Sequence, residues 1–247
     1  MSGQLSLRRL GLLVRNDVLR EQRMLLIISA IIAVLALFGP AGAVYFEYTS
    51  VAFYRTVFLM ALFAFGTITT SMSFSNLHGR TTSTAYLLLP ATSLEKTVAG
   101  LLWGTVLVIV YLLLLTTALS VVVEVLKLAA FGGENELFSP FDRVVWSVVP
   151  HYLVVQSLFF LGAAWFRRLN FIKTLLALVI IVAGLSAFGV GVTWSLTDGG
   201  FTFEDGGYVD FDWAVWLLYY GYHVALPLFC WFVAWLRVKE TQVRHGV

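Results

Sequence analysis

Six apolar stretches, each long enough to cross a lipid bilayer as a helix, dominate this sequence. A helix needs roughly 20 mostly apolar residues to span a hydrocarbon core about 30 Å thick. Of the 247 residues 60% are hydrophobic and 12% are charged, far from the balance of a soluble domain. We predict an all-α integral membrane protein with one transmembrane domain over residues 1–247. The expected transmembrane helices are 24–44, 51–70, 98–123, 144–166, 171–194 and 213–236.

Basic and acidic residues alternate between the connections of these helices. Thirteen of the 16 Lys and Arg residues precede the first helix, follow the second or fourth, or end the chain. Ten of the 14 acidic residues lie in the other connections. Because Lys and Arg are retained on the cytoplasmic side in short loops, both termini are expected to be cytoplasmic.

The segment 5–23 precedes the first expected transmembrane helix and is rich in arginine. Leu7, Leu10, Val14 and Val18 share one face at helical spacing, while arginines point elsewhere. This pattern favours an amphipathic helix lying along the cytoplasmic membrane surface. The alternatives are a basic start that only sets topology, or a cleaved signal for the first apolar stretch, which the long basic region disfavours.

The connection 71–97 contains the run "TAYLLLPATSLEKTVAG" from Thr84 to Gly100. Proline stops a helix that would continue from the leucines, and Thr92 with Glu95 matches the capping-box pattern. A helix is therefore expected to begin at Thr92 and to run into the third transmembrane helix. The apolar residues before it would dip into the membrane interface or bind a groove on a partner protein.

This arrangement resembles the membrane (permease) subunit of type-2 ABC transporters. The resemblance covers nearly the whole chain, and its most suggestive part is the run from Leu87 to Lys96, similar to the "LLPxSxxEK" run of many bacterial members. It implies a bacterial inner-membrane permease subunit of an ATP-driven exporter. In that family this loop docks on the ATPase. The implied coupling residues are Leu87, Leu88, Leu89, Pro90, Thr92, Glu95 and Lys96.

The resemblance also implies partners and cofactors. A cytosolic ATP-binding subunit would carry ATP and Mg, and a second permease subunit, identical or similar, would complete the membrane domain. This chain itself would hold no cofactor or metal and would bind no nucleic acid. Family members often carry two short re-entrant helices before the last transmembrane helix. The corresponding stretch here, Ser195 to Phe211, is glycine-rich and acidic, which is unfavourable for helices.

Motifs of soluble catalysis are missing from the sequence. There is no GxxxxGK[ST] phosphate loop, so ATP hydrolysis is expected in another chain, and there is no HExxH, CxxC or GxSxG motif. The chain is therefore not expected to be an enzyme. A membrane scaffold without transport activity, or an intramembrane enzyme with an unfamiliar site, are the alternative functions.

A few polar residues lie inside the apolar stretches, where such residues are functional candidates. Arg55, near an outer helix end, is expected to extend toward the headgroups. Four others would line a pathway or hydrogen-bond between helices: His151, Gln156, Tyr219 and His223. Gly100 and Gly104 form a GxxxG pattern that allows close helix approach.

Overall fold

The computed structural model describes residues 6–46, 50–78, 89, 91–131, 136–198 and 212–244, in which all regular structure is helical. The elements are α1 (Leu7–Phe46), α2 (Ser50–Met72), α3 (Ser75–His78), α5 (Ser93–Leu102), α6 (Val108–Phe131), α7 (Arg143–Trp165), α8 (Asn170–Asp198), α9 (Asp212–Tyr220) and α10 (Leu226–Arg244). Two π-helical turns interrupt this pattern, η1 (Trp103–Leu107) between α5 and α6, and η2 (Gly221–Ala225) between α9 and α10.

Six helices of the described part are long and apolar enough to cross a membrane, which confirms the expected number. They are α1, α2, the continuous helix α5–η1–α6, α7, α8, and the continuous helix α9–η2–α10. Each matches one expected apolar stretch, and most extend beyond it, whereas α7 ends at Trp165, one residue before the expected end. The chain has the character of an integral membrane protein.

The N-terminal segment differs from the expected arrangement. Residues 5–23 and 24–44 were expected as two helices, whereas α1 is continuous from Leu7 to Phe46. No proline or glycine separates the two stretches, and Leu, Arg, Glu, Gln and Met around residue 20 all favour helix. The arginine-rich segment is thus joined rigidly to the first transmembrane helix.

The main apolar core lies between α1, α2, α6 and α7. Ile32 from α1, Phe58 from α2, Leu112 from α6 and Tyr152 from α7 are all fully or almost fully buried in it. A second cluster joins the turn after α2 to α7 and α10, through residues including Phe74, Phe160, Ala163, Ala234 and Val238. These two cores fix the relative positions of five transmembrane helices.

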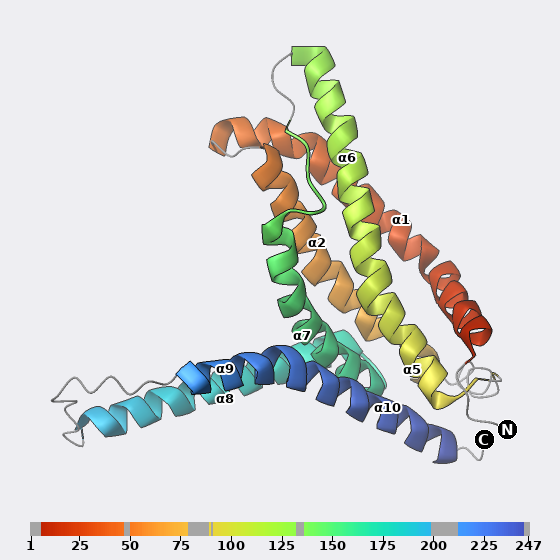
Figure 1. Cartoon of the computed structure of the whole chain (residues 1–247), viewed down its shortest axis with the longest axis vertical. Coiled ribbons are helices and arrows are strands. Elements are labelled where there is room, and N and C mark those ends of the chain that lie inside the picture. Colours follow the sequence, from red (N-terminus) through yellow and green to blue (C-terminus); the bar gives the residue numbers. More distant parts are fainter. Residues whose placement is uncertain are drawn as a thin grey trace.

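One end of the molecule collects the basic connections. The start of α1, the start of α5 and the end of α10 lie together at the lower right of Figure 1. Asn170, the first residue of α8, donates a hydrogen bond to the Ser71 carbonyl, which brings the α7–α8 connection to the end of α2. We call this the basic end.

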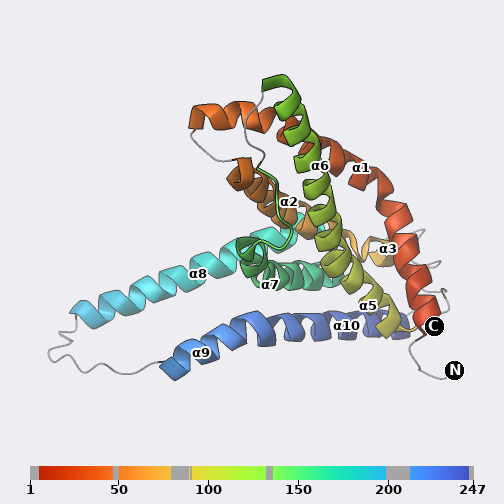
Figure 2. The ribbon, with the colours of Figure 1, turned by 45° about the horizontal axis from the view of Figure 1, so that its top comes forward.

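α8 and the α9 end of the α9–α10 helix extend away from α1 and α6, as both views show (Figures 1 and 2). Every residue of α8 from Val179 to Val190 is exposed, although nearly all are apolar. A helix that is apolar on all sides and unburied fits lipid or a partner protein rather than water.

Candidate functional site

The capping box at the start of α5 forms as expected. The backbone N–H of Glu95 donates to Thr92 Oγ1 at 3.2 Å, and the Thr92 N–H donates to Glu95 Oε2 at 2.8 Å. The helix then continues without a break through η1 into α6, ending at Phe131. This local signal in the sequence therefore starts one continuous helix, Ser93 to Phe131, within the connection 71–97. We call this helix the rod; it consists of α5 (10 residues), η1 (5 residues) and α6 (24 residues).

Glu95 also holds the beginning of α1. Its Oε1 accepts hydrogen bonds from the Ser6 backbone N–H at 2.9 Å and from Arg9 Nε and Nη2 at 3.1 and 2.9 Å. The Glu95 side chain is fully buried, whereas that of Arg9 is 38% exposed. One carboxylate therefore caps α5 and joins it to the arginine-rich start of α1, a contact between distant residues that the sequence did not indicate.

The other expected coupling residues differ in exposure. Lys96 is 3% exposed and faces the interior, whereas Leu89 is 38% exposed, as is Leu94, which was not among the expected coupling residues. Leu87, Leu88 and Pro90 lie outside the described residues. In the described part of this connection, the side chains accessible to a partner are therefore the leucines rather than the Glu95 and Lys96 pair.

A second buried carboxylate joins α1 to the same rod. Glu21 is 4% exposed and accepts a hydrogen bond from Trp103 Nε1 at 3.1 Å, at the start of η1. Arg20 pairs with the other oxygen of Glu21 at 3.0 Å. Sequence reasoning missed this site, although a glutamate close before an apolar stretch was a possible signal.

The π-helical turn η1 lies at a buried polar cluster formed by α2, α7 and α10. The Tyr152 hydroxyl donates to the Gly104 carbonyl at 2.6 Å, a bond between α7 and η1. π-helical turns alter the regular pattern of backbone hydrogen bonds and occur often at functional positions. A Cβ added at Gly104 would lie 2.7 Å from Thr70 Oγ1 and 3.3 Å from Gln156 Nε2, so the glycine is required for this approach.

Gln156 is fully buried in this cluster. Its Oε1 accepts a hydrogen bond from Trp231 Nε1 on α10 at 3.2 Å. Gln156 Nε2 is buried without a partner among the described residues. An unpartnered polar group is uncommon in a core and marks a place where a polar ligand or water would be stabilised.

His151, Tyr219 and His223 meet in a separate cluster where α7 crosses η2. The two imidazole rings are 4.7 Å apart and nearly perpendicular, and Tyr219 lies 4.4 Å from His223 by ring centroids. His223 Nδ1 lies 3.1 Å from the Tyr219 carbonyl, which can only accept, so Nδ1 carries the proton. His223 Nε2 is buried and has no partner in the described part of the chain. Gln156, the fourth polar residue singled out in the sequence, lies in the cluster at η1 instead.

Arg55 has an acidic partner that its own helix did not indicate. It pairs with Asp142, the N-cap residue of α7, whose carboxylate also accepts from the Val144 backbone N–H at 2.8 Å. The Val144 N–H and the Arg55 guanidinium hold the pKa of Asp142 below its ordinary value, against the effect of desolvation. The arginine was predicted from its own helix alone, and the acid lies 87 residues away.

Glu124 is another buried acid that the sequence analysis assigned to an outer connection. It is fully buried on α6, accepts a hydrogen bond from Tyr54 of α2 at 3.1 Å, and pairs with Lys127 at 3.1 Å. Its bond to Tyr54 holds the start of α2 against the end of α6.

Within the described residues, no three His, Cys, Asp or Glu side chains gather in a way that could hold a metal ion.

The chain matches no protein-family model, and it resembles no curated protein and no solved structure. Functional inference therefore depends on the geometry of the molecule and on the motif in its second connection.

Proposed function

We propose that this chain is the permease subunit of an ATP-driven exporter and that a separate ATPase docks on the connection 71–97. The observation that carries the proposal is the double role of Glu95, which caps α5 and holds the start of α1. Force applied to the connection would pass to the first and third transmembrane helices together. Such joining is what a subunit driven by an external engine requires.

The rod from Ser93 to Phe131 supports this mechanism. An uninterrupted helix transmits a displacement of its cytoplasmic start along its whole length, and the Glu21–Trp103 contact holds α1 to it about two turns above Glu95. The η1 turn gives the rod one position with altered backbone bonding, next to the buried cluster of Thr70, Gly104 and Gln156. Movement of the rod would change that cluster first.

The proposal includes partners that supply the missing parts. The ATP-binding subunit brings ATP, Mg and the hydrolytic residues, and a second permease subunit, identical or similar, completes the transport path. The exposed apolar surface of α8 offers area for such a subunit or for lipid. A bacterial inner membrane is the location that the resemblance implies.

Copurification tests the proposal. The tagged chain is extracted from its native membranes in mild detergent, and bound proteins are identified by mass spectrometry. We expect a soluble protein with a GxxxxGK[ST] loop in near-equal amount. Leu88→Asp and Leu89→Asp should each lower its recovery at least about tenfold, because a charge in an apolar contact costs about 2 kcal/mol or more.

A matched control uses the opposite end of the molecule. Leu137, which is 51% exposed in the segment before α7, takes the same Leu→Asp change and should retain the ATPase fully. Recovery of a full complement of ATPase with both Leu88→Asp and Leu89→Asp would reject the docking assignment. Recovery of the unmodified chain without any ATPase would favour a scaffold role.

A further inference from the structure

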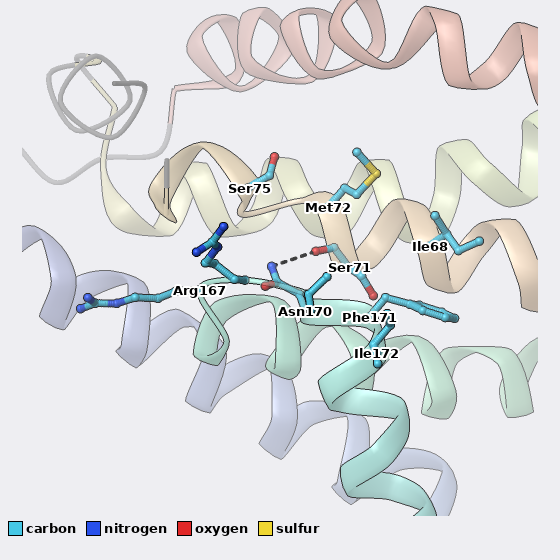
Figure 3. Close-up of a pocket in the computed structure, with 10 residues that line it drawn as sticks. Ile68, Ser71, Met72, Ser75, Arg167, Asn170, Phe171 and Ile172 are labelled. Carbon is cyan, nitrogen blue, oxygen red and sulfur yellow. Dashed lines mark hydrogen bonds between the residues drawn. The ribbon is translucent and has the colours of Figure 1, made fainter. Parts of the chain in front are cut away.

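A groove of about 1070 Å³ opens at the basic end between two connections of the chain. One wall is the end of α2 and the turn after it, and the other is the α7–α8 connection with the first residues of α8 (Figure 3). The hydrogen bond from Asn170 Nδ2 to the Ser71 carbonyl, 3.4 Å long, joins the two walls. The groove does not involve the buried polar clusters. Ser71, Met72 and Ser75 belong to the connection 71–97 on which the ATPase is proposed to dock, whereas the wall that carries Arg167 and Arg168 lies outside it.

The lining of the groove changes from polar to apolar along its length. In Figure 3, Arg167 and Ser75 lie at one end, Ser71 and Asn170 in the middle, and Ile68 and Phe171 at the other end. Ile68 belongs to the membrane-crossing part of α2, whereas Ser75 lies beyond the end of that helix. With α2 crossing a membrane, the apolar end would lie at the hydrocarbon region and the polar end at the headgroups.

The level of the two arginines follows from the short connection that carries them. Only four residues, 166–169, separate α7 from α8, so Arg167 and Arg168 cannot extend far from the membrane surface. Both are exposed, and neither pairs with an acidic side chain in the described part of the chain.

Neighbouring side chains support this placement. Arg237 lies over the Trp165 ring at 4.9 Å, and Lys173 over the Phe166 ring at 5.9 Å. Rings of this kind beside basic groups are typical of the headgroup region.

We propose that this groove binds an anionic phospholipid of the same leaflet. The phosphate lies against Arg167 and Arg168, exposed Ser75 offers a hydroxyl donor, and one acyl chain covers Ile68 and Phe171. Basic pockets between membrane helices on the cytoplasmic side recognise such headgroups. The apolar end of the groove, at Ile68 and Phe171, distinguishes this site from a basic patch on the surface, which would have no such end. A free phosphate would make no contact with that apolar end.

Native mass spectrometry of the purified full chain tests the proposal. The protein is titrated with phosphatidylglycerol and with phosphatidylcholine of the same acyl chains, and bound lipid is counted. We expect about tenfold or greater preference for phosphatidylglycerol. Arg167→Gln with Arg168→Gln should remove that preference, and Arg167→Lys with Arg168→Lys should retain most of it.

The matched control is Arg8→Gln with Arg15→Gln, which removes the same charge from two exposed positions of α1. This control variant should leave the preference for phosphatidylglycerol unchanged. An equal loss of preference in both double variants would mean that general surface charge causes it, and would overturn the site.

Millimolar inorganic phosphate should not displace the lipid, and full displacement would assign a free-phosphate site instead. Equal affinity for short-chain and long-chain phosphatidylglycerol would overturn the role of the apolar half.

Discussion

Arg9 and Glu95, separated by 86 positions in the sequence, form an ion pair with N–O distances of 2.9 and 3.1 Å. The acid is fully buried and the base is partly exposed, so the carboxylate depends on its donors more than the guanidinium does. Four donors satisfy it: the Ser6 and Thr92 amides and two nitrogens of Arg9. This carboxylate is where the N-terminal helix, the second connection and the third transmembrane helix meet.

Glu95→Gln should destabilise the protein clearly. The amide keeps one acceptor oxygen but places an NH2 group against donors, so we expect a loss of about 1.5–3 kcal/mol in the free energy of unfolding. Thermal unfolding in detergent measures it. Glu240→Gln makes the same change in the exposed Arg237–Glu240 pair and should cost less than about 0.5 kcal/mol. Equal effects of the two variants would contradict the assigned role of Glu95.

Gly104→Ala should also destabilise, for a steric reason. The added Cβ would lie 2.7 Å from Thr70 Oγ1, which forces α2 away from η1 at an estimated cost of about 1–3 kcal/mol. Gly184→Ala is the control, because a Cβ there meets nothing within 4 Å, and it should be neutral or slightly stabilising. The same thermal assay compares them. A neutral Gly104→Ala would show that the helices can separate without loss.

The transmembrane helices were predictable from the sequence, because each depends on a long apolar stretch and not on its neighbours. The capping box was predictable for the same reason: Thr92 and Glu95 are three residues apart. The GxxxG pattern correctly indicated close approach, and Gly100 and Gly104 meet Phe160 and Thr70 within one chain.

The partners of buried polar groups were not predictable, because each pair joins residues far apart in the sequence. Nothing near Arg55 indicated Asp142, and nothing near Glu21 indicated Trp103. The two π-helical turns coincide with contacts between residues far apart in the sequence, the Tyr152–Gly104 hydrogen bond at η1 and the His151–His223 ring contact at η2. The continuity of α1 was missed because an amphipathic segment and a transmembrane helix were treated as separate elements.

Gln156 and Trp231 should behave as a coupled pair. Trp231→Phe removes the donor and leaves the whole Gln156 amide unpartnered, so we expect a loss of about 1–2 kcal/mol. Gln156→Leu should cost less, because it also removes the unpartnered Nε2. The double variant should be more stable than the sum of the single losses predicts, by about 0.5–1.5 kcal/mol. Strict additivity in unfolding experiments would mean that the hydrogen bond contributes nothing.

Asp142 should make the stability of the folded protein depend on pH under acidic conditions. Its pKa is lowered first by the Val144 backbone N–H and then by Arg55, so the ionised form is favoured in the folded protein. That contribution is fully present above the unfolded value of about 3.9 and is lost as pH falls through the folded pKa. Asp142→Asn keeps a good N-cap but loses the charge that pairs with Arg55. The gap in unfolding temperature between wild type and this variant should be widest at about pH 6 and narrow below about pH 4. A gap that stays constant on acidification would show that the ionised carboxylate does not stabilise the fold, and that Arg55 is held in place by packing alone.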